Sequence, residues 1–124
     1  MTREELLQGV SVLTLPDSFW RSYGIPAHMP FAGTAEHPLT HKLEEIAVNQ
    51  AFHTLTQRQQ MAVLAHEMGH IRANHPKFIR DMRWECEADD YAVSLGYKEE
   101  MIQVLSMYNT DEAKFRIAAM RGGK

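Results

Sequence analysis

The chain has little cysteine, no long apolar run and no strong excess of either charge, and each absence narrows the class of protein. A single cysteine among 124 residues excludes an internal disulfide and suits a reducing compartment. The formal net charge of −3 gives no electrostatic reason to expect nucleic acid or an anionic membrane as a partner. No apolar run approaches the length of a membrane span, and the first residues lack the apolar region of a signal peptide. We therefore expect a cytoplasmic protein.

The bulk composition indicates one small folded unit. Hydrophobic residues make up 44% and charged residues 23% of the chain, which is ordinary for a globular protein. The sequence has no repeat, no low-complexity tract and no linker that would separate a second domain. A chain of this length buries a single core, so we expect residues 1–124 to form one domain.

The most informative stretch is residues 66–70, His-Glu-Met-Gly-His, which has the pattern H-E-x-x-H. Residues four apart in a helix lie about 40° apart around its axis. His66 and His70 can therefore bind one metal ion through their imidazole nitrogens. Glu67 lies at the rim of the same face, where it can take a proton from a metal-bound water.

The flanking residues predict the helix that this motif requires. Thr56 with Gln59 fits a capping box for a helix that starts at residue 57, and Asn74 with Pro76 ends it. Apolar residues recur at helical spacing and should face a core; these are Met61, Leu64, Met68 and Ile71. A second stripe of small residues would let another helix approach closely; it consists of Ala62, Ala65, Gly69 and Ala73. This register argues against the alternative, a chance match on an ordinary core helix.

A catalytic zinc needs a third protein ligand, and the next predicted helix, residues 78–95, offers carboxylates. Glu85 and Asp89 interrupt what should be its buried apolar face. A buried carboxylate needs a partner, and a metal ion is a good one. We therefore predict Glu85 as the third ligand. Asp89 could orient a metal-bound histidine through its ring N–H.

Two neighbouring residues, Glu87 and Cys86, remain as alternative ligands on this helix. Glu87 points roughly 200° away from Glu85 by the helical period, towards a side that looks solvated, and it is the alternative third ligand. Asp90 is interpreted as surface charge. Cys86 could be a soft ligand, but free cysteine more often behaves as a small buried hydrophobe.

The motif at residues 66–70, followed by E-C-E-A-D-D-Y-A at residues 85–92, resembles the signatures of the gluzincins, zinc metallopeptidases whose third ligand is a glutamate. More narrowly, the chain is similar to the HtpX and CAAX-prenyl-protease family, whose second signature is E-x-x-A-D. The resemblance covers roughly residues 29–120 and again selects Glu85 as ligand and Asp89 as supporting acid. Membrane helices usual in that family are missing, and the gap between the signatures is short. In size the chain is closer to the small ImmA-type peptidases of phages and mobile elements.

The whole chain is interpreted as an α+β fold, a mini-zincin core with about four or five helices packed on a small sheet. Further helices are expected at residues 3–8, 98–108 and 111–120, strands at 10–15 and 43–49, and a short strand near 30–32. A helical turn at 17–23 should carry aromatic side chains that cover the sheet; these are Phe19, Trp20 and Tyr23. The loop at 24–40 and its end hold His28, His37 and His41, whose spacing matches no known metal site.

The expected activity is that of a zinc metalloendopeptidase. Zinc would polarise the scissile carbonyl and acidify its water, and Glu67 would accept the proton and pass it to the leaving amine. The oxyanion needs a donor beyond the metal, and the candidates are His75, Tyr91, Tyr108 and Arg116. The closing R-I segment of the resembling family favours Arg116. The alternative role of Arg116 is a salt bridge to a carboxylate such as Asp89.

A protein or peptide substrate is expected by analogy, because an exposed sheet edge can bind an extended peptide as an added strand. Two other functions remain open. One is a regulatory or interaction protein that keeps the zinc-binding core without cleaving, although the intact Glu67 argues against it. The other is an amidase that acts on a small molecule.

Overall fold

The computed structural model describes residues 1–36, 43–75 and 81–122. Over these residues it contains six α-helices, one 3-10 helix and a three-stranded sheet, which confirms the predicted α+β class. The elements are α1 (Arg3–Leu7), β1 (Ser11–Thr14), α2 (Asp17–Arg21), β2 (Ala32–Glu36), β3 (Leu43–Val48), η1 (Gln50–Thr54), α3 (Gln57–Ala73), α4 (Met82–Ser94), α5 (Lys98–Leu105) and α6 (Asp111–Met120). None of the described helices is both long and apolar enough to cross a bilayer.

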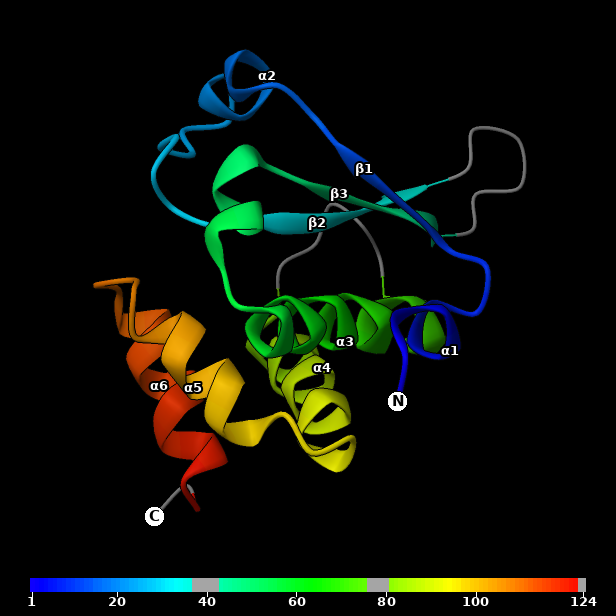
Figure 1. Ribbon diagram of the computed structural model, residues 1–124. Helices are drawn as coiled ribbons and strands as arrows, with labels where there is room; N and C mark the ends of the chain where they lie inside the picture. Colours follow the sequence, from blue (N-terminus) through cyan, green and yellow to red (C-terminus); the bar gives the residue numbers. More distant parts are fainter. Residues whose placement is uncertain (37–42, 76–80, 123–124) are drawn as a thin grey trace.

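The molecule is layered around α3 (Figure 1). The sheet forms one layer, α3 runs beneath it, and α4, α5 and α6 lie on the other side of α3. Helix α3 contacts β2 and β3 on one side and α4 and α5 on the other, and α1 packs against it as well. Since α3 carries the H-E-x-x-H motif, the motif lies at the junction of the two layers.

The sheet has the order β1-β3-β2, with β1 parallel and β2 antiparallel to the central strand β3. Ile46 and Val48 on β3 are fully buried, as the predicted apolar face requires. Trp20 is buried as expected, and its indole N–H donates to the carbonyl of Val48 at 3.3 Å. The expectation is wrong for Tyr23, which is 70% exposed and contacts the ring of Phe19 instead.

Helix α3 starts and ends where the sequence predicts. The Thr56 hydroxyl accepts from the backbone N–H of Gln59, and the Gln59 side chain accepts from the N–H of Thr56, both at 3.1 Å. At the other end Asn74 adopts the left-handed conformation with φ of 53°. A residue in this conformation terminates a helix and reverses the chain.

Helix α4 begins later than predicted. The sequence predicts a helix over residues 78–95, of which 78–80 lie outside the described residues. Asp81 is extended, with φ of −134°, and its carboxylate accepts from the backbone N–H of Arg83. It therefore acts as the N-cap, so that α4 starts at Met82. Helix α5 also ends three residues before the predicted boundary, at Leu105.

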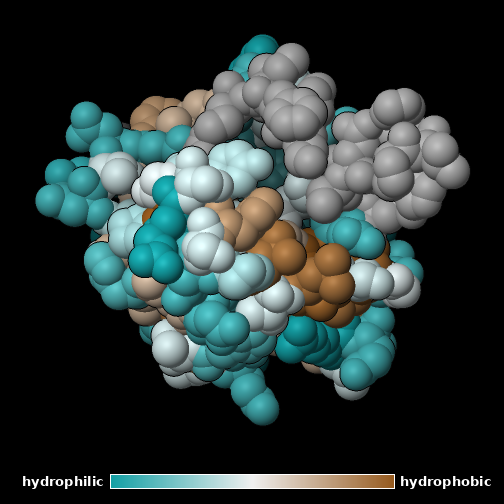
Figure 2. Space-filling model, turned by 90° about the horizontal axis from the view of Figure 1, so that it is seen from above, coloured by the Kyte–Doolittle hydropathy of each residue, from teal (hydrophilic) through white to brown (hydrophobic). Residues whose placement is uncertain are grey.

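The face of the molecule seen from above in Figure 2 is mostly polar, with apolar side chains gathered beside the grey residues. Large exposed apolar side chains on the sheet side of the described chain include Leu13 on β1 and Phe19 on α2.

Candidate metal centre

Gly69 in the middle of the motif sets how closely α3 and α4 approach. A Cβ atom added to Gly69 would lie 2.8 Å from the Cα of Ala88 on α4, closer than real Cβ atoms come. Ala62 and Ala65 of the same small-residue stripe are fully buried, whereas Ala73 is exposed. The absence of a side chain at Gly69 thus brings α4 against the histidine-bearing face of α3.

This approach gathers His66, His70 and Glu85 into one cluster. The two Nε2 atoms of the histidines are 3.1 Å apart. The Glu85 carboxylate lies 3.5 Å from Nε2 of His66 and 3.0 Å from Nε2 of His70. Among the described residues, these three form the group of side chains that could hold a metal ion.

The spacing of these donor atoms fits a tetrahedral zinc site. Zinc bonds to nitrogen and oxygen of about 2.0–2.1 Å place two ligand atoms roughly 3.3 Å apart around a tetrahedral ion. The three observed separations, 3.0, 3.1 and 3.5 Å, bracket that value. Three ligands leave a fourth position for water or substrate, which is the arrangement of a catalytic site.

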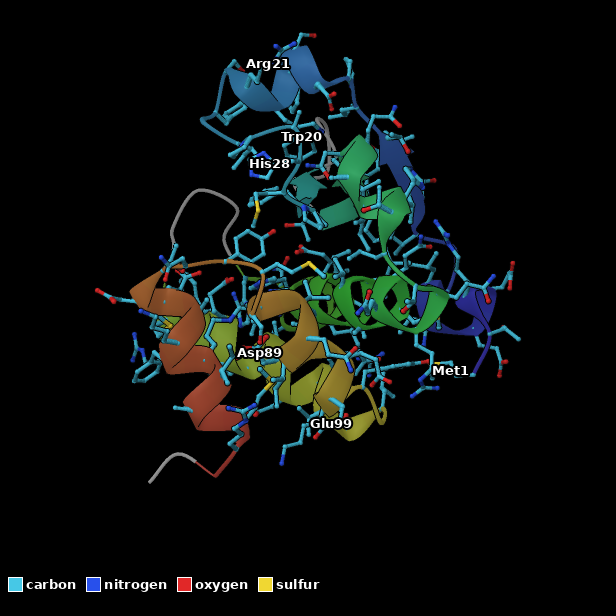
Figure 3. All side chains as sticks on the ribbon, turned by 60° about the vertical axis from the view of Figure 1, so that its left-hand side comes forward. Met1, Trp20, Arg21, His28, Asp89 and Glu99 are labelled. Atoms are coloured by element: carbon cyan, nitrogen blue, oxygen red, sulfur yellow. The ribbon has the colours of Figure 1, made fainter. Side chains whose placement is uncertain are left out.

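The far side of the His66 ring is held by Asp89 and Arg116. Nδ1 of His66 lies 2.8 Å from a carboxylate oxygen of Asp89. Arg116 on α6 donates to both oxygens of that carboxylate, from Nε at 2.8 Å and from Nη2 at 2.7 Å. Figure 3 shows Asp89 in the interior, among the helices. Because an ionised carboxylate only accepts hydrogen bonds, Nδ1 of His66 carries a proton, and in the neutral ring Nε2 is left with the lone pair that faces the cluster.

The electrostatics of these groups reflect burial and mutual contact. Burial lowers the pKa of His66, but hydrogen bonds to Asp89 and Glu85 outweigh it and raise the pKa to about 9. For Glu85 burial raises the pKa, yet hydrogen bonds from His66 and His70 hold it well below its usual range. Burial raises the pKa of Glu67, a shift that the neighbouring histidines oppose. Glu67 is thus a more basic carboxylate than an exposed one.

The remaining candidates have other partners. Arg116 forms an ion pair with Asp89, which is the alternative role that the sequence analysis gave it. Burial raises the pKa of Tyr108 to about 12, and Tyr108 lies close enough to Glu67 for that charge to act on it. The Tyr91 ring faces the guanidinium of Arg72. Cys86 is half-buried rather than fully buried.

The loop histidines are not part of this cluster where the structure describes them. Figure 3 shows His28 at the sheet end of the molecule, away from Asp89. His37 and His41 lie outside the described residues.

The structure shows hydrogen bonds of two residues, His75 and Glu87, that the sequence did not predict. His75 is the first residue after the left-handed Asn74. It forms a hydrogen bond with His70 through one ring nitrogen and with Glu87 through the other. Glu87 therefore partners His75 and lies outside the cluster of potential metal ligands. Helical periodicity cannot show this, because His75 follows the chain reversal at the end of α3.

In a comparison with protein families, residues 37–83 match the model of peptidase family M48. The match supports a zinc metallopeptidase of this family, a gluzincin, and so confirms the predicted resemblance. It contains the H-E-x-x-H motif and stops before Glu85, Asp89 and Arg116. No curated protein and no solved structure matches the chain.

Proposed function

On the premise that residues 37–83 belong to the metallopeptidase type described by family M48, we propose that the chain is a zinc metalloendopeptidase. His66, His70 and Glu85 hold the ion, and Glu67 acts as the general base. The observation that carries this proposal is the convergence of two Nε2 atoms and one carboxylate at the spacing of a tetrahedral site.

Zinc bound there supplies Lewis-acid chemistry, which polarises the scissile carbonyl and makes water acidic enough to attack near neutral pH. Glu67 follows His66 directly in α3 and is 6% exposed. Its raised pKa suits a group that accepts a proton from water and returns it to the leaving amine. Asp89 and Arg116 keep His66 in a single orientation during these transfers.

The sheet supports a peptide as substrate. Strand β2 pairs with β3 on one side, and no second partner is seen among the described strands. β2 is also in contact with α3, the helix of the proposed catalytic residues. An extended peptide could add to this edge through main-chain hydrogen bonds, which would bring its backbone to the metal centre.

The proposal is tested first on the metal and then on cleavage. Wild type purified without added metal, or loaded with zinc, should contain about one ion per chain. Glu85→Ala should lose this ion, while Glu87→Ala, two residues along α4, should still bind one ion when zinc is saturating. Retention by Glu85→Ala together with loss by Glu87→Ala would reverse the assignment of the third ligand.

Cleavage is assayed by mass spectrometry on a mixed peptide library, because the substrate is unknown. Glu67→Gln should bind zinc like the wild type and cleave at least about 100-fold more slowly, since general acid–base catalysis contributes on that order. Cleavage at the wild-type rate would remove Glu67 from the mechanism. Zinc binding without cleavage of any peptide, in the wild type as well, would favour the regulatory protein over the enzyme.

A further inference from the structure

His75 has both of its ring nitrogens engaged although it is outside the cluster of potential metal ligands. Nδ1 lies 3.0 Å from Nδ1 of His70, and Nε2 lies 2.9 Å from a carboxylate oxygen of Glu87. The ring stacks on Trp84 with centroids 5.3 Å apart and planes 16° from parallel. His75 is 7% exposed, so that its position is fixed by packing as well as by hydrogen bonds.

The direction of these hydrogen bonds follows from the carboxylate end. An ionised Glu87 only accepts, so Nε2 of His75 must carry a proton. In a neutral imidazole Nδ1 is then the acceptor, and Nδ1 of His70 must donate to it. His70 is left with a lone pair on Nε2, the atom that faces His66 and Glu85.

The backbone ties His75 to the same histidine. Asn74 is left-handed, and the N–H of His75 donates to the carbonyl of His70 at 3.1 Å. A bond of this span closes a helix C-terminus after a left-handed residue. His75 therefore contacts His70 twice, through its backbone and through its ring, and the end of α3 presents the ring at a fixed place.

We propose that His75 and Glu87 are positioning residues that hold His70 with its Nε2 lone pair directed at the metal. The proposal rests on the proposed zinc site. His66 is supported by a carboxylate directly, whereas His70 is supported by an imidazole that a carboxylate in turn orients. Loss of such an outer partner typically weakens metal binding 10- to 100-fold.

The test measures zinc affinity by competition with a chelator in the full-length chain. His75→Phe keeps an aromatic ring on Trp84 but removes both nitrogens, and we expect about 10- to 100-fold weaker zinc binding. His75→Gln restores an acceptor for His70 and a donor for Glu87, so its affinity should return towards that of the wild type. Rescue by Gln but not by Phe is a result that a merely structural role would not give.

Glu87→Ala provides a second variant that leaves the core intact, because the Glu87 side chain is 60% exposed. It should weaken zinc binding, whereas Asp90→Ala, which removes an exposed carboxylate from the same helix, should not. The visible spectrum of bound cobalt should change in His75→Phe and Glu87→Ala and stay unchanged in Asp90→Ala.

The outcomes distinguish the positioning role of His75 and Glu87 from the zinc-site proposal on which it rests. If the wild type binds zinc and both His75→Phe and Glu87→Ala bind it equally well, the positioning role is wrong and the zinc site stands. If the wild type binds no zinc, the zinc site and the positioning role both fall. Should His75→Phe fail to fold by circular dichroism, Glu87→Ala against Asp90→Ala decides.

Discussion

Arg116 contacts three carboxylates from one buried guanidinium. It donates to Asp89 from two nitrogens, and its Nη1 lies 3.5 Å from Glu112 and 3.8 Å from Glu85. Burial lowers the pKa of Arg116, but the hydrogen bond and charge of Asp89 raise it well above its usual range. Asp89 is 1% exposed, and without Arg116 it would lose the cation that donates two hydrogen bonds to it in the interior.

Replacing Arg116 tests whether it positions Asp89 or stabilises an oxyanion. Removal of one partner of a buried ion pair costs about 3–5 kcal/mol, so Arg116→Ala should unfold at clearly lower urea. Arg116→Lys should be intermediate, because an ammonium cannot donate bidentately. An Arg116→Ala variant with wild-type stability and zinc affinity but slow cleavage would support the oxyanion role that the sequence favoured.

Among the elements, the crossing of α3 and α4 decides whether the candidate ligands meet. The contact is backbone against backbone at Gly69 and Ala88, so neither helix can move aside by a change of rotamer. Glu85 and Asp89 lie on either side of Ala88 along α4. A shift of α4 would therefore displace a proposed ligand and the partner of His66 together.

Gly69→Ala should destabilise the protein and weaken zinc binding. Overpacking costs about 1–3 kcal/mol, whereas alanine gains about 1 kcal/mol over glycine in helix propensity. Because the added Cβ would clash with the backbone of Ala88, we expect the overpacking cost to lie at the upper end of its range and to exceed this gain. Gly33→Ala is the matched control, because a Cβ there meets nothing within 4 Å. Urea denaturation and chelator competition measure both effects. Equal or greater stability in Gly69→Ala would show that the helices separate without cost.

The sequence predicted the elements best where side chains mark their ends. Thr56 caps α3 at the expected residue, and Thr110 caps α6, which starts at the predicted residue 111, since hydroxyls that accept from the first turn are local signals. The face of α4 that carries Glu85 and Asp89 also followed from periodicity. The pairing of His75 with Glu87 could not be predicted in this way. It depends on a left-handed residue and on the angle between two helices, and helical periodicity reports neither.

For the molecule as a whole, the metal-free state should lose stability as pH rises. The contacts of His66 raise its pKa to about 9 in the folded protein, from an ordinary value of 6.5. Its contribution to the free energy of unfolding is complete below pH 6.5 and is lost as pH rises through 9. Glu67, whose pKa burial also raises, acts in the same direction at lower pH.

Zinc should offset this loss, since it displaces the second proton of the charged His66 ring, the one on Nε2. Free zinc at 100 times the dissociation constant adds about 2.7 kcal/mol of stability. Thermal unfolding of chelated and zinc-loaded protein between pH 6 and 9 is the measurement, and the difference in Tm should widen with pH. A difference that stays constant would mean that no histidine proton is displaced by the metal.

The groups around the candidate metal centre come from α3, α4 and α6, in that order along the chain. Asp89 relies for its counter-charge on Arg116, which the ribosome adds 27 residues later. During synthesis, the two histidines and Glu85 therefore emerge before the cation that holds Asp89 in place. A nascent chain that has not reached α6 carries all three proposed ligands but leaves His66 without its fixed partner. The hydrogen-bonded arrangement around the candidate centre is therefore complete only once α6 has docked and Arg116 has reached Asp89.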